Sequence, residues 1–223
     1  MDEKLITVTG HGCIHVVPDV TRLNISLVSL HDSYEDAYRQ AKSDIDRMSK
    51  IMSEVKLDPT LPKTQSLDIS KKTKSEYDKF GHYKSETFIG FELSHEVKID
   101  LGMDNVLLNK VVRLIGKHIK QAEISIGYTV RDPRPSQLKM LERAVKDAKE
   151  KATIMANACG CRLGLVKNIN YSVNEIHIYS QARNIHEAAE AACCDESSLD
   201  ITPDDLAVAD DVTVVWYLSN DVK

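Results

Sequence analysis

Apolar and polar residues alternate along several stretches of the chain, and a period of two is typical of β-strands with one buried face. These stretches span residues 6–10, 14–30, 88–101, 122–130, 163–173 and 207–218. His11 and Gly12 separate the first two stretches and favour a turn or bulge, so we expect the chain to open as a β-hairpin. Because Pro18 has no backbone N–H group, the second strand is expected to bend or to lie at a sheet edge there.

Three other stretches repeat apolar residues at spacings of three and four, which predicts amphipathic helices. The first helix is expected after Ser33, because Asp36 three residues later completes a capping pattern. Its apolar stripe consists of Tyr34, Tyr38, Ala41, Ile45, Met48, Met52 and Val55. The second helix is expected to follow Gly102 and to stop near Gly116. Its apolar face consists of Leu107, Val111, Leu114 and Ile115.

A third and longest helix is expected between Pro135 and Gly160, with the glycine as its C-terminal cap. Its stripe consists of Leu138, Leu141, Val145, Ala148, Ala152, Met155 and Cys159. The order of elements predicts an α+β fold, in which a largely antiparallel mixed sheet carries the long helices packed on one face. No stretch reads as a linker, so one domain is expected over residues 1–223.

An extended hairpin is predicted between the strand that begins at Leu67 and its partner from about Phe88. Its tip, around residues 71–86, is rich in lysine and should be exposed to solvent. A second polar connection, around residues 180–205, is expected to be mobile. The side chains proposed here as interface candidates are Lys72, Lys74, Tyr77, Phe80, Tyr83 and, in the last strand, Trp216.

The amino-acid composition indicates which partners and which cellular location to expect. The apolar fraction of 42% is enough for a substantial core, and the formal net charge of −5 argues against nucleic acid, which requires a basic face. No apolar stretch is long enough for a membrane span or a signal peptide. We therefore expect a cytoplasmic protein as the sequence is written, or a periplasmic or envelope protein if an export signal has been removed.

His11, Cys13 and His15 are the candidate metal ligands. On one uninterrupted strand they share a face and offer two imidazoles and a thiolate to zinc. A fourth ligand is missing, however, and the neighbouring Gly12 favours a structural hairpin over a metal site.

The five cysteines are interpreted as thiols, because an odd count in a chain of this size does not suggest a disulfide framework. Cys159 continues the helical stripe and is expected to pack in the core, while Cys161 is one residue too close to form a Cys-x-x-Cys motif. Cys193 and Cys194 fall in the polar connection. No phosphate-binding loop, nucleophile elbow or His-Glu-x-x-His pair is present, so neither an enzyme nor a cofactor is predicted.

Several segments in a fixed order resemble the SIMPL-domain family, a bacterial family of unknown function. They are the opening 6–12 with Val17-Pro18-Asp19, the run 90–101, and the helical 143–152 leading into 159–164. The resemblance implies a mixed sheet with long helices on one side, homo-oligomers that include rings, and no established catalytic residues. It also implies links to envelope or stress physiology in bacterial members and to signalling-kinase adaptors in eukaryotic relatives.

The leading hypothesis is therefore a non-enzymatic, stress-related scaffold that forms homo-oligomers through strand edges or the long hairpin and binds a protein or small ligand. The alternative is a metal-binding or small-ligand-binding protein, or a hydrolase, with a site near the N-terminal hairpin.

Overall fold

The computed structural model describes residues 3–77, 79–171, 180, 183–184 and 202–219. The chain divides into two compact units, which are described separately. Unit 1 comprises residues 1–18, 129–179 and 203–223, and unit 2 comprises residues 19–128 and 180–202. One domain was expected because no linker-like stretch interrupts the sequence. The chain passes from one unit to the other at Pro18 and at Tyr128 without a linker-like composition at either point.

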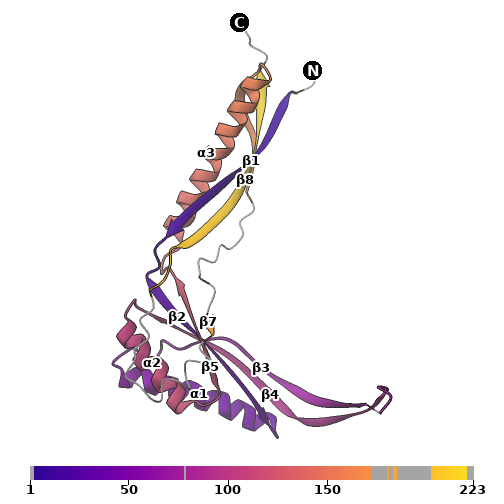
Figure 1. Cartoon of the computed structure of the whole chain (residues 1–223), viewed down its shortest axis with the longest axis vertical. Coiled ribbons are helices and arrows are strands. Elements are labelled where there is room, and N and C mark those ends of the chain that lie inside the picture. The colour runs from indigo at the N-terminus through magenta and orange to yellow at the C-terminus, as the bar shows by residue number, and fades with distance from the viewer. Residues whose placement is uncertain (1–2, 78, 172–179, 181–182, 185–201, 220–223) are drawn as a thin grey trace. The chain divides into compact units, whose positions relative to one another are not determined.

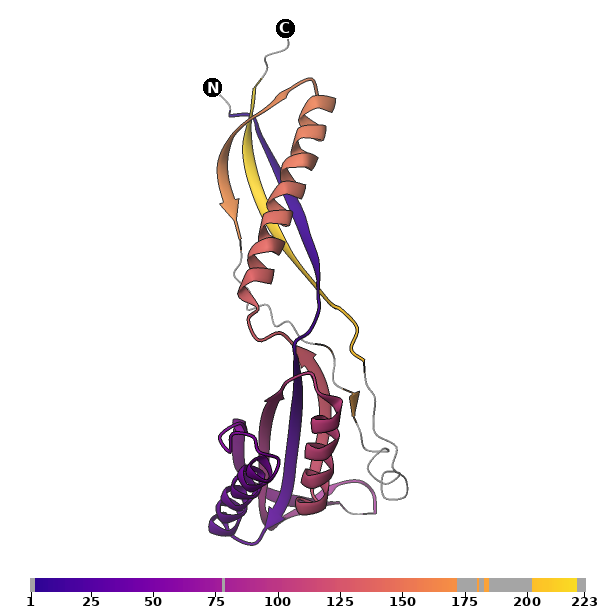
Figure 2. The same ribbon diagram turned by 90° about the vertical axis from the view of Figure 1, so that its left-hand side faces the viewer.

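Unit 2 contains a five-stranded sheet with the strand order β3-β4-β2-β5-β7. Its elements are β2 (Val20–His31), α1 (Tyr34–Glu54), β3 (Lys63–Tyr77), β4 (Tyr83–Leu101), α2 (Asn105–His118), β5 (Ala122–Thr129) and the short β7 (Arg183–Asn184). The first six elements follow the order of a split βαβ motif, in which each helix crosses the sheet between non-adjacent strands. Helices α1 and α2 lie beside the sheet in both views (Figures 1 and 2).

The core of unit 2 follows from the predicted alternation. In β2 the fully buried side chains are Leu23, Ile25 and Leu27, and in β4 they include Val97 and Ile99. Helix α1 covers them with Met48 and Met52 and helix α2 with Leu108, Val111 and Ile115. Because these side chains come from both helices and share one core, the helices cover the same face of the sheet, as the sequence predicted.

Two helix boundaries test the capping predictions. Ser33 caps α1 as expected, since its Oγ accepts a hydrogen bond from the Asp36 N–H group at 3.1 Å. Helix α2 was expected to stop near Gly116, and it ends at His118, two residues later. A Cβ at Gly116 would meet no atom within 4 Å, so a larger residue fits at this position.

The predicted stripe of α1 was wrong in the first turns, where Tyr34 and Tyr38 are more than half exposed. The helix buries the predicted Ala41, together with Ala37 and Asp44, which were not predicted. Small side chains allow close packing there.

Within its described residues, unit 1 contains a three-stranded antiparallel sheet with the strand order β1-β8-β6 and a single helix. Its elements are β1 (Leu5–Val16), α3 (Arg134–Ala158), β6 (Arg162–Asn170) and β8 (Leu206–Ser219). Strand β1 pairs with β8 from Leu5 opposite Tyr217 to Val16 opposite Leu206. The predicted opening hairpin was therefore wrong, because β1 runs without a turn through Gly12 and its partner is the last strand.

Helix α3 lies along β1 in both views (Figures 1 and 2), and the contact is made by small residues. Its fully buried positions are spaced by four and are Met140, Ala144, Ala148, Ala152 and Ala156. A Cβ on Gly10 would lie 2.1 Å from the Ala144 carbonyl oxygen, and one on Gly12 would lie 2.2 Å from the Met140 carbonyl oxygen. The glycines of β1 thus admit the helix backbone itself, which no larger residue would allow.

The predicted α3 stripe was right at Ala148 and Ala152, which are fully buried, and wrong at its ends. Leu138 and Met155 are 59% and 44% exposed, and Cys159 is exposed beyond the last helical turn. Gly160 follows with φ of 70°, as expected of a C-terminal cap. None of the helices in the described ranges carries an apolar stretch that could cross a bilayer.

Candidate functional site

The outer half of the β3–β4 hairpin is a two-stranded ribbon that extends beyond the rest of the sheet (Figure 1). Strand β2 ends at His31, opposite Phe91 of β4, so from residue 90 outward β4 pairs only with β3. The ribbon is defined here as residues 71–90. It includes the tip of 71–86 that the sequence predicted, and its strands run on to the hairpin turn between Tyr77 and Tyr83.

A β-bulge marks the point where the ribbon leaves the sheet. Lys72 pairs with Gly90 and Thr73 with Phe88, which leaves Ile89 as the extra residue. Gly90 has a φ of 146°, and a Cβ there would lie 2.6 Å from the His31 carbonyl oxygen. Only glycine fits this conformation and this space, so Gly90 fixes the direction of the ribbon.

Large apolar side chains are exposed on the ribbon. The exposed set consists of Tyr77, Phe80, Tyr83, Phe88 and Ile89, at 41% to 76%. Tyr77 and Tyr83 contact each other edge to face at 6.3 Å between ring centroids. A two-stranded ribbon has little stability of its own, and a concentration of exposed aromatic side chains is typical of surfaces that bind another protein.

Charged groups surround these aromatic side chains. Lys72 pairs with Glu92 across the strands at 2.6 Å, and Thr73 donates a hydrogen bond to Glu86. Lys74 is exposed, as is the Lys79 ammonium, which lies 5.8 Å from the centroid of the Phe80 ring. The interface candidates of the ribbon predicted from sequence are therefore all at its surface.

The β6 edge of the unit 1 sheet is a second exposed apolar surface. Leu165, Val166 and Ile169 are 82%, 50% and 51% exposed. Among the described residues no strand pairs with the outer edge of β6. Beside it, a cavity of about 540 Å³ lies between β6 and α3, with Val145, Thr153 and Trp216 among its lining residues.

The opposite edge, on β1, is covered by two side chains of α3. The Arg143 guanidinium donates a hydrogen bond to the Cys13 carbonyl oxygen at 2.7 Å, and the His11 N–H group donates one to the Asp147 carboxylate at 2.7 Å. Asp147 also pairs with Lys151 at 2.6 Å. The Lys151 hydrogen bond, followed by that from His11, lowers the pKa of Asp147 below its usual value.

The three predicted metal ligands do share one face of β1. His11, Cys13 and His15 are all exposed, because the intervening residues face α3. The His11 ring is hydrogen-bonded through Nδ1 to Asp211 of β8, while Ala209 and Ala207 stand opposite Cys13 and His15. Within the described ranges no group of three or more potential ligands converges on one point. These three residues therefore lie on the same face of β1, but their side chains do not converge on a common point where a metal ion could bind.

Trp216 and the cysteines complete the predicted set. Trp216 is only 4% exposed and belongs to the core between the sheet and α3, so it is not on the surface of this chain. Cys159 was expected in the core and is instead exposed, while Cys161 is half-buried. Cys193, Cys194 and most of the 180–205 connection lie outside the described residues.

Two buried titratable residues, Asp44 and His95, were not predicted from the sequence, and His95 lies in the sheet. It occupies an inward position of β4 between Leu93 and Val97 and is 2% exposed. The signal was available, because a histidine interrupts an otherwise apolar alternation at an inward position.

Comparison with known protein families gave a match. The sequence model of the SIMPL family, described as "Protein of unknown function (DUF541)", matches residues 6–216. A search of curated proteins gave no match.

Proposed function

The chain belongs to the SIMPL family, whose description assigns no function, and on that premise we propose that it is a non-enzymatic protein that assembles with copies of itself through the ribbon. The observation that carries this proposal is the group of exposed aromatic side chains on an otherwise unsupported pair of strands. The side chains of Tyr77, Phe80, Tyr83 and Phe88 are 50–76% exposed, and contact of their apolar surface with water is unfavourable. Covering this surface with another protein surface would therefore stabilise the assembly.

The chain offers a surface of the right kind for the ribbon. The β6 edge has unpaired backbone groups on its outer side within the described part of the chain, together with exposed Leu165 and Ile169. A ribbon that aligns with such an edge adds strands to the sheet, and its side chains enter the cavity next to it. The proposal is therefore that the ribbon of one copy docks on the β6 edge of the next.

Contact between two different surfaces has a consequence for the assembly. Each copy uses its ribbon as donor and its β6 edge as acceptor, so the contact is heterologous. Heterologous contacts produce closed rings when the rotation between copies closes, and open fibres when it does not. A ring accounts for complete burial of all ribbons and all β6 edges without a free end.

The test is the mass of the assembly in solution. The triple variant Tyr77→Ser/Phe80→Ser/Tyr83→Ser removes the aromatic side chains while leaving the strand pairing and charges in place. Light scattering coupled to gel filtration is expected to show several chains for the wild type and one chain for the variant. Circular dichroism should show the same secondary-structure content for both proteins.

Matched controls remove exposed apolar side chains elsewhere. Val17→Ser and Val106→Ser change residues that are 72% and 79% exposed and lie outside both the ribbon and β6. Both controls should assemble like the wild type. A wild type with the mass of a single chain, or a triple variant that keeps the wild-type mass, contradicts the proposal.

A further inference from the structure

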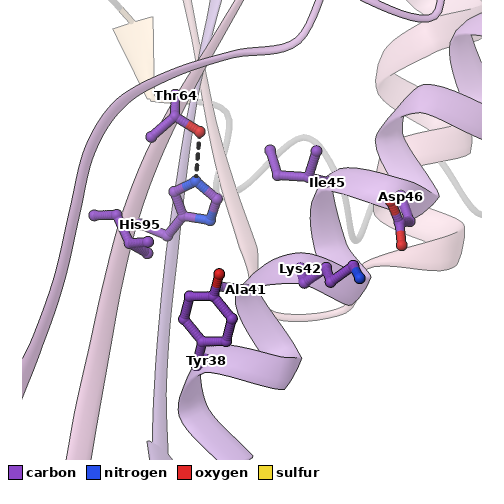
Figure 3. A pocket seen from close by; sticks show the side chains of 8 residues that line it. Tyr38, Ala41, Lys42, Ile45, Asp46, Thr64 and His95 are labelled. Carbon is purple, nitrogen blue, oxygen red and sulfur yellow. Dashed lines mark hydrogen bonds between the residues drawn. The ribbon is translucent and has the colours of Figure 1, made fainter. Parts of the chain in front are cut away.

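A cavity of about 230 Å³ lies in unit 2 between α1 and the strands β3 and β4. Figure 3 shows its residues, with Thr64 of β3 and His95 of β4 facing Tyr38, Ala41 and Ile45 of α1. The cavity forms because α1 covers β4 closely but leaves β3 almost uncovered, since all but one of the β3 side chains are exposed. It is smaller than the roughly 300–1,000 Å³ of sites for drug-sized molecules, so its contents are limited to about one ring.

His95 is the polar group at the inner wall of this cavity. Its Nε2 atom forms a hydrogen bond of 3.0 Å with the Thr64 hydroxyl group. Its Nδ1 atom is buried and has no hydrogen-bond partner. Figure 3 shows that this second nitrogen is on the α1 side of the ring. A buried imidazole nitrogen without a partner is uncommon, because such groups are normally satisfied by protein, water or a ligand.

Charges in and near the cavity are balanced. Burial lowers the pKa of His95, and this effect outweighs the opposing influence of Asp44 and Glu96, so the ring is neutral at pH 7. Asp44 is itself buried and accepts hydrogen bonds from Gln40 at 2.9 Å and from Gln121 at 3.3 Å. The charged lining residues, Lys42 and Asp46, are of opposite sign.

The remaining wall is apolar. Ala41, Ile45 and Leu67 line the cavity, and Leu67 is 44% exposed although it points toward the helix side of the sheet. Figure 3 shows the charged ends of Lys42 and Asp46 directed away from His95. The wall next to His95 therefore has one unsatisfied hydrogen-bonding group and no charge, and an ion placed there would lose hydration without gaining a counter-ion. It favours an apolar body with one polar group.

We infer that this cavity is a binding site for a small, uncharged, largely apolar molecule whose single hydroxyl or amide group forms a hydrogen bond with His95 Nδ1. A hydroxyl group suits the site whichever way the Thr64–His95 hydrogen bond runs, since it donates to an unprotonated Nδ1 and accepts from a protonated one. The site is independent of the ribbon, so its failure and the failure of the proposed assembly are separate outcomes.

Phenol is the probe for the test, with benzene and benzoate as matched ligands that lack the hydroxyl group or carry a charge. Nuclear magnetic resonance of the full-length wild type should show that phenol shifts the His95 ring nitrogens and gives proton–proton contacts to the methyl groups of Ile45 and Leu67. Benzene and benzoate are expected to bind at least tenfold more weakly than phenol.

Two variants then test whether the hydrogen bond with His95, and not apolar contact alone, determines the affinity for phenol. His95→Leu should lower phenol affinity at least tenfold and make phenol and benzene equivalent, whereas His118→Leu, on the exposed end of α2, should bind phenol like the wild type. If His95→Leu does not fold, the wild-type shifts and contacts decide alone. Three results overturn the inference: no response of His95 to phenol, equal affinity for phenol and benzene in the wild type, or a crystal soaked in phenol that shows only water next to Nδ1.

Discussion

The two edges of the unit 1 sheet are treated differently by the same helix. Along β1, α3 supplies Arg143 and Asp147, which bind a carbonyl oxygen and an N–H group of the edge strand. Along β6, α3 leaves a cavity, and Leu165 and Ile169 remain exposed. An uncovered strand edge is a template for another strand, and natural proteins block the edges that must not pair.

The difference between the edges indicates which one is available for assembly. Arg143 and Asp147 are four residues apart and therefore lie on the same side of α3, next to β1. Both reach the strand because the glycines of β1 bring the helix backbone into contact with it. The close contact between α3 and β1 thus allows α3 side chains to cover the edge of β1. Within the described residues, strand β6 has no such close contact with α3, and its edge is not covered by α3 side chains.

The largest expected effect comes from Gly10→Ala, which forces α3 away from β1. The new Cβ would lie 2.1 Å from the Ala144 carbonyl oxygen, so the helix must move. We expect the free energy of unfolding of unit 1 to fall by ~3 kcal/mol or more. Trp216 is the only tryptophan of the sequence and lies in the core of unit 1, so its fluorescence during urea unfolding measures this change.

Gly116→Ala is the matched control for that variant. The same added methyl group meets nothing within 4 Å and sits inside α2, where alanine is preferred over glycine. Unit 2 should gain about 1 kcal/mol of stability, measured by circular dichroism. A Gly10→Ala protein with a wild-type Trp216 transition would show that α3 and β1 are not in close contact.

The next effect follows from uncovering the β1 edge without moving the helix. In Arg143→Ala/Asp147→Ala, the Cys13 carbonyl and the His11 N–H group lose their partners and become free to pair with another strand. Light scattering should then show larger and more heterogeneous assemblies than the wild type forms. Glu142→Ala/Lys146→Ala removes an ion pair of the same helix that does not reach β1, and it should assemble normally.

Lowering the pH is expected to have a smaller effect on the free energy of unfolding of unit 1. The pKa of Asp147 is lowered in the folded protein, so its stabilising effect is complete above the unfolded value of about pH 4 and is lost as the pH falls through the lowered folded pKa. Urea unfolding of unit 1, followed by Trp216 fluorescence between pH 5 and pH 3, should lose stability more gradually in Asp147→Asn than in the wild type. Equal slopes would mean that the carboxylate does not hold the edge.

The smallest effect on stability is expected on the β6 side. Leu165 is 82% exposed, so Leu165→Thr should change the free energy of unfolding by no more than about 0.5 kcal/mol. It should nevertheless weaken the assembly, because it removes an apolar contact for the docked ribbon. A variant that is less stable but assembles fully would place Leu165 in the core and not at an interface.

Local patterns in the sequence predicted the elements well. The alternation of Leu23, Ile25 and Leu27 identified a buried strand, and Ser33 with Asp36 identified the start of α1. These signals act over a few residues, so they are visible without knowledge of the partner. The exposed ribbon could likewise be predicted from its lysines and aromatic residues.

Long-range packing could not be predicted in the same way. The pairing of β1 with β8 joins residues about 200 positions apart, and an alternating pattern does not identify its partner. The α3 stripe was wrong at Leu138 and Met155 because large apolar residues were expected to be buried, whereas the close approach of Gly10 selects a small residue such as Ala144. His95 was overlooked because a polar residue was not sought among inward positions.

The central strand of the unit 1 sheet is also the last one to be synthesised. Strand β8 lies between β1 and β6, so neither has its partner until about 190 further residues have followed Val16. At roughly 5–20 residues per second, the nascent β1 waits on the order of 10–40 s on the ribosome, while residues 19–128 can already collapse. During that interval β1 has no strand partner, and its unpaired backbone groups can pair with another chain.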